Sequence, residues 1–323
     1  MHSAEYFRDL FESELGHWIP QGNPPTLYEP IRYACLSGGK RTRPVLFLMT
    51  AELFGLNPHE VMPQAVALEL FHAFTLVHDD IMDQAVLRRG QQSVHVRYGE
   101  ATAILAGDAM LVSCLGLLTK CPAAWQSEVL NQFISCALKV CEGQQLDMDF
   151  ERKNKVSVEE YMQMISLKTA ELLGFSAQLA AILAGASPAD RSAAYLFGKN
   201  LGLAFQLQDD YLDAFGQTRL TGKLSGSDFS RNKKTYLLAK SFEVVSSEEA
   251  QQLVRLLNSN SLQPPDVERI KALIIKAGVD RMLLDEIAAY TAEALKHLML
   301  ISAPAQKKEE LKKLADNLKI RQG

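Results

Sequence analysis

Cysteine and tryptophan are scarce in this sequence, with five and two residues among 323. The cysteines are odd in number and none has the CxxC spacing of a redox or thiolate metal site. Most of them lie in apolar runs, where cysteine behaves as a small buried hydrophobe. This usage fits a reducing compartment, and we expect a cytoplasmic protein.

A secretory leader and long uninterrupted apolar runs are also lacking. The N-terminal segment MHSAEYFRDLFESEL is acidic and amphipathic, without the basic start and apolar centre of a signal peptide. The longest apolar stretch, Leu172 to Ala186, contains Gln178 and is shorter than the roughly 20 residues that span a bilayer. It predicts a buried core helix, and we expect no stable membrane insertion.

An excess of basic residues is absent as well. The formal net charge at pH 7 is -4 and the isoelectric point is about 6.0. Nucleic-acid binders concentrate lysine and arginine against the phosphate backbone, so this composition argues against a nucleic-acid partner. Any anion that the protein binds must be held by a local group of cations.

Helix-forming residues dominate what is present. Leucine, alanine, methionine, glutamate, glutamine and lysine are abundant, and the period-two alternation of a half-exposed strand is nearly absent. Two capping boxes, Ser157-x-x-Glu160 and Ser246-x-x-Glu249, mark helix starts. We predict an all-α fold, a single large helical bundle with a central cavity, formed by residues 1–323 as one domain.

An acidic cluster interrupts one of the apolar segments. Asp79, Asp80 and Asp83 lie within one helical turn of LVHDDIMD. Asp79 and Asp83 are spaced i,i+4, so their carboxylates project from one helix face and repel each other. Burial among apolar neighbours raises the cost of this repulsion, and a bound divalent cation would remove it.

A second cluster, Asp209-Asp210-x-x-Asp213, repeats this spacing in another apolar helix, and Gln206 shares the face of Asp209 and Asp213. A single cluster of this kind is more often solvated surface, but the pair in apolar settings favours a metal site. Two such helices facing each other across a bundle would form a cavity for Mg²⁺, which takes further ligands from water and substrate phosphates. Diphosphate is therefore the expected ligand.

The doublet His78-Asp79 permits a different interpretation, the metal site of a His-Asp phosphohydrolase. Such a site needs further histidines upstream in the chain. His72 is the only close candidate, so we do not favour this interpretation.

Several cations are available to bind such an anion. Lys40, Arg41 and Arg43 follow two glycines and precede a proline that is expected to start a helix, so amides and cations converge there. Arg88 and Arg89 closely follow the first acidic cluster. For Arg41, and for the Arg88-Arg89 pair, a surface basic patch is the alternative interpretation.

Two further groups of lysines lie later in the chain. Lys168 is inside the apolar run MISLKTAELL, where an unpaired ammonium would be costly, so a buried anion is its expected partner. The long polar segment from Gly216 to Lys234 contains Lys223 and Lys233. We expect it to close over the same anion as a lid, although a charged loop is usually just solvated.

In chain order the sequence carries GGKRTRP, His72 with DDIMD, LRRG, LAGDAML, GQQLD, LKTAEL, and FQLQDDYLD followed by GKLSGSDFSRNKKT. With these motifs the chain resembles, over nearly its whole length, the trans-type prenyl diphosphate synthases, the farnesyl and geranylgeranyl diphosphate synthase family. Chance agreement at so many ordered sites is negligible. The resemblance implies the isoprenoid synthase type of helical bundle, usually assembled as a homodimer.

The resemblance also implies roles for the matching residues. Isopentenyl diphosphate would be bound by Lys40, Arg43, His72 and Arg89. Two Mg²⁺ ions would be held by Asp79 and Asp83, and a third by Asp209. The allylic diphosphate would be bound by these three ions together with Arg88, Lys168, Lys223 and Lys233. Thr169 and Gln206 would lie beside the forming allylic cation.

The implied activity is transfer of a prenyl group from dimethylallyl, geranyl or farnesyl diphosphate to isopentenyl diphosphate by ionisation, condensation and elimination. A class I terpene cyclase would need only the first acidic motif. GGKRTRP and Arg89 argue against it, because a cyclase has no second diphosphate to bind. A non-catalytic subunit of a heteromeric synthase is the other alternative, but both acidic motifs and Lys168 are present.

Product length would be set by residues that precede Asp79 on the same helix. Phe74 lies five positions and Phe71 eight positions before Asp79, and a ring at either place would stop the growing chain. For Phe71, ordinary core packing is an equally good interpretation. In related enzymes an aromatic residue at the position of Phe74, beside a small residue such as Thr75, is typical of a geranylgeranyl or farnesyl product.

Overall fold

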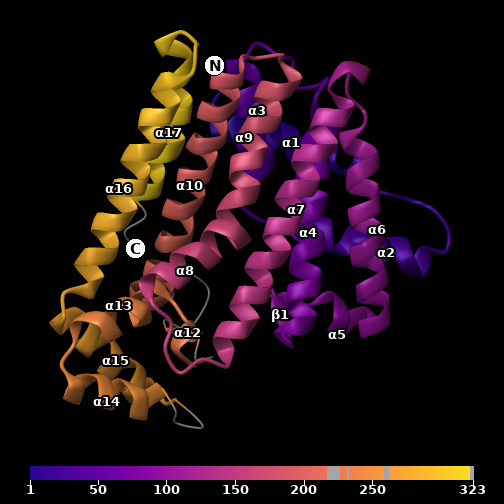
Figure 1. The fold of residues 1–323 in the computed structure, drawn as a ribbon. Helices are drawn as coiled ribbons and strands as arrows, with labels where there is room; N and C mark the ends of the chain where they lie inside the picture. Colours follow the sequence, from indigo (N-terminus) through magenta and orange to yellow (C-terminus); the bar gives the residue numbers. More distant parts are fainter. Residues whose placement is uncertain (217–225, 231–232, 258–261, 321–323) are drawn as a thin grey trace. The chain divides into compact units, whose positions relative to one another are not determined.

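The computed structural model describes residues 1–216, 226–230, 233–257 and 262–320. Within these ranges helices form almost the whole structure (Figure 1). The one pair of strands among the described residues is antiparallel and very short, β1 (Leu87–Arg88) with β2 (Gln91–Gln92). The predicted all-α fold is confirmed.

The chain forms two compact units. The first contains Met1–Ile134, Phe175–Ala194 and Ile301–Leu311, and the second contains Ser135–Gly174, Tyr195–Leu300 and Lys312–Gly323. Helices α7 (Ala123–Glu151), α9 (Glu171–Leu183), α10 (Pro188–Phe215) and α17 (Ala305–Ile320) contribute residues to both. That residues 1–323 act as one domain stays a prediction.

The first unit is organised around helix α4 (Met62–Met82). This helix packs against α1 (Ala4–Trp18), α2 (Pro25–Leu36), α3 (Thr42–Leu53), α5 (Val94–Tyr98) and α6 (Glu100–Leu118), and Figure 1 shows α4 and α6 side by side. Every residue from Met62 to Phe71 is buried, whereas from His72 onwards most are only partly buried. The apolar first half of α4 thus anchors the helix in the core, and its second half carries the first acidic motif towards accessible space.

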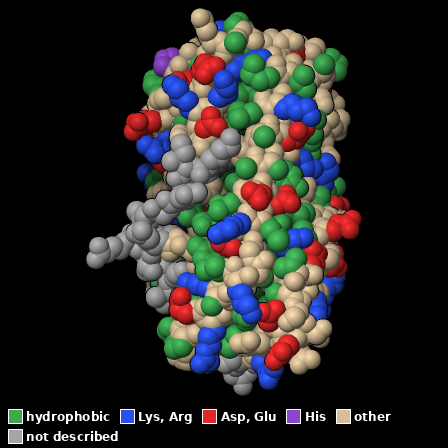
Figure 2. Space-filling model, turned by 90° about the vertical axis from the view of Figure 1, so that its left-hand side faces the viewer, with side chains coloured by type: hydrophobic (Ala, Val, Ile, Leu, Met, Phe, Trp, Pro, Cys, Tyr) green, Lys and Arg blue, Asp and Glu red, His purple; other side chains and the backbone are tan. Residues whose placement is uncertain are grey.

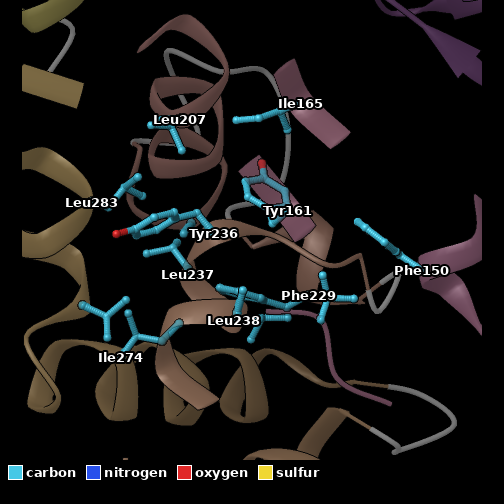
Figure 3. Close-up of a cluster of buried hydrophobic side chains, with 14 of the residues drawn as sticks. Phe150, Tyr161, Ile165, Leu207, Phe229, Tyr236, Leu237, Leu238, Ile274 and Leu283 are labelled. Carbon is cyan, nitrogen blue, oxygen red and sulfur yellow. The ribbon is translucent and has the colours of Figure 1, made fainter. Parts of the chain in front are cut away.

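The second unit contains a separate apolar core. Its elements are α8 (Val158–Ile165), the π-helical turn η1 (Ser166–Ala170), α12 (Ser227–Ser230), α13 (Tyr236–Val244), α14 (Ser247–Leu257), α15 (Pro264–Lys276), α16 (Val279–Leu300), and parts of the shared helices. Figure 3 shows the buried side chains that meet there, including Tyr161 from α8, Leu207 from α10, Tyr236 from α13 and Leu283 from α16. This core fixes α8 and α10, which carry the second acidic motif and its neighbours.

Both predicted capping boxes are confirmed. The backbone N–H of Glu160 donates to Ser157 Oγ at 3.1 Å, and the N–H of Ser157 donates to the Glu160 carboxylate at 2.9 Å. Ser246 and Glu249 form the same reciprocal pair at 3.3 and 3.0 Å. Each box satisfies amides at a helix N-terminus that would otherwise lack partners.

The most apolar helices differ in burial. Helix α9 is mostly buried, which confirms the core helix predicted for the stretch after Leu172. Among the described residues, α6 is the helix that is long and apolar enough to cross a membrane by length and composition, and 39% of that window is buried. The absence of stable membrane insertion stays a prediction.

The five cysteines are all free thiols. Cys35, Cys114 and Cys136 are buried, as expected for small hydrophobes, whereas Cys141 is exposed. Burial raises the pKa of Cys35 to about 12, so this thiol is not reactive at neutral pH.

Charged side chains are mixed on the molecular surface shown in Figure 2. Basic and acidic groups alternate over that face, with apolar side chains between them and no broad area of one sign. This distribution agrees with the small net charge of -4.

Candidate active site

The first acidic motif lies at the C-terminal end of α4. Asp80 is buried, and Nε and Nη2 of Arg88 donate to its Oδ1 at 3.0 and 2.5 Å. Asp79 is partly buried, and Asp83, the C-cap residue, is exposed. One of the three carboxylates is thus neutralised by a cation of the protein, while the other two reach accessible space.

Arg88 is held by this ion pair. Burial alone would lower the pKa of Arg88. The hydrogen bond and charge of Asp80, together with the charges of Asp79 and Asp83, outweigh burial, and the pKa of Arg88 is raised. The guanidinium is therefore an integral part of the motif and not an isolated member of a surface patch. An allylic diphosphate bound through Arg88 would share this guanidinium with Asp80.

The two glycines of GGKRTRP shape a tight loop between α2 and α3. Gly38 and Gly39 have φ angles of 81° and 136°, which side chains rarely tolerate. A Cβ on Gly39 would lie 2.7 Å from the guanidinium of Arg89. Arg89 donates to the carbonyl of Gly38 and, at 3.3 Å, to Ser37 Oγ. The glycines allow the loop to close around Arg89, which joins two motifs that are distant in the sequence.

Arg41 is a buried structural residue, so its interpretation as part of a surface patch is wrong. Its side chain is 1% exposed and donates to Glu69 Oε1 at 2.5 Å, to Glu12 Oε1 at 2.7 Å and to the carbonyl of Cys35 at 2.7 Å. It connects α1, α2 and α4 at the start of α3, where Arg41 itself adopts a left-handed φ of 49°. The loop that carries the neighbouring cations is fixed by these bonds.

His72 lies within a group of arginines. Arg43 Nη1 is 3.2 Å from His72 Nε2. Burial first, and then the charges of Arg43, Arg89 and Arg88, lower the pKa of His72 well below 6.5. The ring is therefore neutral at pH 7, and its Nε2 accepts a hydrogen bond from Arg43. The structure brings three of the residues predicted to bind isopentenyl diphosphate into one cationic group, while Lys40 lies exposed in the same loop.

A cavity connects this cationic group with the first acidic motif. It has a volume of about 30 Å³ and lies between α2, α4 and the β1–β2 hairpin. Its lining includes Ser37, His72, Asp80, Arg88 and Arg89. Arg88 and Arg89 contribute donors to its wall, beside the carboxylate of Asp80.

Lys168 has a carboxylate partner that the sequence analysis missed. Its Nζ lies 2.6 Å from Asp147 Oδ2, on α7. A Cβ on Gly143 would lie 2.3 Å from the Lys168 backbone nitrogen, so glycine is needed for α7 to approach the π-helical turn η1. In the GQQLD motif, Gly143 and Asp147 are spaced i,i+4 and share one face of α7, but nothing in the sequence relates that face to Lys168.

Thr169 and Gln206, predicted to lie beside the allylic cation, are in contact. Thr169 Oγ1 donates to Gln206 Oε1 at 3.0 Å, and Gln206 Nε2 donates to Asp210 Oδ1 at 3.1 Å. Asp210 also accepts a hydrogen bond from the hydroxyl of Tyr161. Burial raises the pKa of Asp210 to about 7, although the hydrogen bonds from Tyr161 and Gln206 and the charge of Lys233 oppose this shift. The sequence analysis included Asp210 only as a member of the second acidic cluster and assigned no role to Tyr161.

The other two aspartates of the second motif have different surroundings. Asp209 is partly buried and is the one predicted to bind metal. Asp213 Oδ2 accepts the backbone N–H of Asp228 at 3.0 Å, and the Asp213 carbonyl accepts that of Gly226 at 2.6 Å. Asp213 thus holds the start of α12, the described part of the predicted lid. Lys233, the other described end of the lid, is exposed.

Some predicted features lie outside the described residues. Lys223 and most of the lid fall in 217–225 and 231–232, outside the described residues. The first acidic motif belongs to the first unit and the second motif to the second unit, so their facing each other stays a prediction.

The carboxylates of the first acidic motif fit Mg²⁺. No three His, Cys, Asp or Glu side chains among the described residues already converge as metal ligands. Mg²⁺ is commonly bound by one or two carboxylates and completes its octahedron with water and substrate phosphates. The accessible oxygens of Asp79 and Asp83 fit that pattern.

Phe71 and Phe74, the predicted chain-length residues, differ in exposure. Phe71 is fully buried, and its ring centroid lies 5.1 Å from that of Phe133. Phe74 is partly buried, with its ring 4.8 Å from that of His78, next to Asp79. The packing of Phe71 agrees with an ordinary core role, whereas Phe74 stands closer to the acidic motif.

The fold and the ordered motifs define an all-α protein of the prenyl-transfer class. The model of the polyprenyl synthetase family matches residues 24–274. The chain belongs to this family and is a short-chain prenyltransferase.

Individual relatives agree with this assignment. The geranylgeranyl diphosphate synthase of Methanosarcina mazei is 39% identical over 234 residues, 72% of each chain. The short chain isoprenyl diphosphate synthase of Methanothermobacter thermautotrophicus is 37% identical over 254 residues, 78% of each chain.

Solved structures are similar over the whole chain. A crystal structure of a geranylgeranyl pyrophosphate synthase has a TM-score of 0.94 at 39% identity and covers 100% of both chains. The Corynebacterium glutamicum geranylgeranyl pyrophosphate synthase, complexed with isoprenyl diphosphate and magnesium, has a TM-score of 0.89 at 27% identity, covering 99% of this chain and 100% of that one.

Proposed function

We propose that this protein condenses isopentenyl diphosphate with an allylic diphosphate in a Mg²⁺-dependent reaction to give geranylgeranyl or farnesyl diphosphate. The observation that carries the proposal is the arrangement along α4. The accessible carboxylates of Asp79 and Asp83 lie at its end, and His72 with Arg43 and Arg89 lies two turns before them. Such a site would bind the allylic diphosphate through metal ions and isopentenyl diphosphate through cationic side chains, as a reaction between two diphosphates requires.

The residues around the allylic diphosphate would act on its departure. Bound Mg²⁺ would supply electrostatic stabilisation of the leaving group. Asp79, Asp83 and Asp209 would hold the metal, in three ions by the family resemblance, and Arg88, Lys168, Lys223 and Lys233 would add charge-assisted donors. Magnesium together with isoprenyl diphosphate in the Corynebacterium relative supports this part of the proposal.

The residues around the allylic carbons would protect and stabilise the cation. Thr169 Oγ1 and Gln206 Oε1 place two oxygens side by side, 3.0 Å apart. Oxygen dipoles aimed at a carbocation stabilise it without capturing it. The double bond of isopentenyl diphosphate would then attack the cation, and the released diphosphate would accept the proton, so no side-chain base is required.

An assay with purified protein, Mg²⁺, labelled isopentenyl diphosphate and each allylic primer tests the proposal. We expect elongated products, identified by mass spectrometry, that disappear with EDTA and return with Mg²⁺. The absence of elongated product with every primer would refute the condensation. A cyclic hydrocarbon formed without isopentenyl diphosphate would instead indicate a terpene cyclase.

The metal ligands have their own test. Asp79→Ala and Asp209→Ala should each lower turnover by roughly 100-fold or more, because the leaving group loses its main electrostatic partner. Asp285→Ala, an exposed position on α16, is the matched control. Circular dichroism should show unchanged helical content in all three variants, and normal turnover in either of the first two would remove that residue from the metal site.

We also propose a homodimer in the cytoplasm. Ile104, Leu105 and Val112 on α6 are 41%, 59% and 68% exposed, so this helix presents several apolar side chains that a second copy of the chain could cover. The free cysteines fit a reducing compartment. Sedimentation should give a dimer mass, and Leu105→Asp with Val112→Asp should shift it to the monomer; a monomeric wild type would contradict the assembly.

A further inference from the structure

Tyr161 places a hydroxyl inside the core of the second unit. Its ring is 2% exposed and packs in the apolar cluster formed with α10 and α13. In Figure 3 the Tyr161 hydroxyl points to the region between Ile165 and Leu207, whereas the Tyr236 hydroxyl points towards Leu283. A buried hydroxyl needs a partner, and for Tyr161 that partner is the carboxylate of Asp210.

Asp210 is surrounded by donors. Its Oδ2 accepts the Tyr161 hydroxyl and, at 3.3 Å, the backbone N–H of Tyr236. Its Oδ1 accepts Gln206 Nε2 at 3.1 Å. Both oxygens of Asp210 accept hydrogen bonds in the structure, and the end of the Gln206 amide that faces them is its NH₂ end.

The orientation of Gln206 then determines what Thr169 encounters. With its NH₂ group on Asp210, Gln206 turns Oε1 towards Thr169, whose hydroxyl donates to it at 3.0 Å. The hydroxyl hydrogen is directed at Gln206, and the lone pairs of Thr169 Oγ1 are left for other neighbours. If the amide were reversed, its NH₂ group would face Thr169 and would present a positive end in the same place.

We propose that Tyr161 is a positioning residue for prenyl transfer, because through Asp210 it fixes the Gln206 amide so that the oxygens of Gln206 and Thr169 face the allylic cation. This inference rests on the proposed function, in which Thr169 and Gln206 lie beside that cation. Tyr161 touches neither substrate nor metal in this account. Its hydroxyl holds the carboxyl group of Asp210 in place, and that group in turn holds the NH₂ end of the Gln206 amide.

The geometry separates this role from ordinary packing. Tyr161 and Tyr236 are both 2% exposed in the same cluster, yet Tyr236 reaches Asp210 with its backbone and Tyr161 reaches it with its hydroxyl. Removing one hydroxyl oxygen from Tyr161 therefore alters the hydrogen bonds of Asp210 and leaves the ring in the core.

The test compares Tyr161→Phe with Tyr290→Phe. Tyr290, on α16, packs against the same cluster, and its hydroxyl is near Glu286 rather than Asp210. For Tyr161→Phe we expect kcat to fall roughly 10- to 100-fold, the range found when supporting partners of active-site groups are removed. The KM for each diphosphate should change less than about threefold, because the proposed role concerns the allylic cation and not diphosphate binding. Tyr290→Phe should retain wild-type kcat.

A double-mutant cycle distinguishes positioning from a general loss of stability. In a Gln206→Ala background the amide is gone, so Tyr161→Phe should lower kcat no further. Additive losses in the two variants would overturn the proposal, as would wild-type kcat in Tyr161→Phe. If circular dichroism shows that Tyr161→Phe does not fold, Asp210→Asn takes its place. The asparagine amide can pair with either orientation of Gln206, so the same drop in kcat with unchanged KM is expected. Wild-type kcat in Asp210→Asn would overturn the proposal. Failure of the proposed function is seen separately, as an inactive wild type.

Discussion

Lys168 Nζ lies 2.6 Å from Asp147 Oδ2, so the ammonium proposed to bind the allylic diphosphate already has a carboxylate partner. The two side chains are 22% and 17% exposed, enough for an incoming anion to reach them. A diphosphate that binds here must share the ammonium with Asp147 or displace the carboxylate. The pair keeps a partly buried charge satisfied until substrate arrives.

Asp147→Asn should make the protein less stable and more responsive to anions. Loss of the carboxylate removes the ion pair with Lys168, at a cost of about 1–3 kcal/mol in the free energy of unfolding. Inorganic pyrophosphate with Mg²⁺ would replace the missing charge, so it should raise the melting temperature more in the variant than in the wild type. Asp149→Asn, on the same helix and exposed, is the control; equal ligand-induced shifts in both variants would contradict the pairing.

Arg41→Ala should destabilise the protein strongly. The substitution leaves Glu69, whose side chain is 4% exposed, as a buried charge without its guanidinium, which typically costs about 3–5 kcal/mol. Arg8→Ala removes an exposed arginine with only surface ion pairs and should cost less than about 1 kcal/mol. Urea unfolding of the two variants measures the difference, and similar midpoints would show that the Arg41 network does not hold the loop.

Stability should fall as the pH drops below 6.5 because of His72. Its pKa is well below 6.5 in the folded protein, owing to burial and then to Arg43 and Arg89. At a pH between the pKa of His72 in the folded protein and its pKa in the unfolded chain, His72 is protonated only in the unfolded chain. Unfolding therefore becomes more favourable as the pH falls through this range. Asp210, with its pKa raised to about 7, acts in the opposite sense over part of this range.

His72→Gln isolates the histidine contribution, since glutamine keeps a neutral hydrogen-bonding group at that place and leaves Asp210 unchanged. Urea midpoints between pH 5 and 7.5 should decrease more steeply towards acid in the wild type than in the variant. Parallel curves would mean that His72 takes up its proton as readily in the folded protein as in the unfolded chain.

Phe74→Ala should lengthen the product. The partly buried ring lies beside His78 near the first acidic motif, where a growing prenyl chain would meet it. Its removal should add one or more five-carbon units, read by mass spectrometry of the hydrolysed products. Phe71→Leu is the comparison, because its fully buried ring packs on Phe133 and should affect stability more than length. An unchanged product profile in Phe74→Ala would remove Phe74 from chain-length control.

The helical fold and part of the site could be predicted because their signals are local. The capping boxes at Ser157 and Ser246, the buried helix after Leu172 and the spacing of Asp79 and Asp83 are written in short stretches of sequence. Each depends on neighbours within a few positions along one helix. Such features follow from helical geometry alone.

The remaining features depend on contacts between distant segments. Arg41 looked like one more cation of a basic loop, and only the fold shows Glu12 and Glu69 converging on it. Lys168 was correctly expected to need an anionic partner, but Asp147 lies one helix away and carried no signal of its own. The link from Tyr161 to Asp210 likewise joins positions that no periodicity relates.

The central claim is that Asp79, Asp83 and Asp209 bind divalent ions that share one diphosphate. A crystal structure with Mn²⁺ and an unreactive allylic thiodiphosphate tests it most directly, through the anomalous signal of the metal. We predict metal peaks at about 2.0–2.3 Å from the carboxylate oxygens of both acidic motifs, each also bound to diphosphate oxygen. Metal-bound diphosphate with either motif far from every ion would contradict the account.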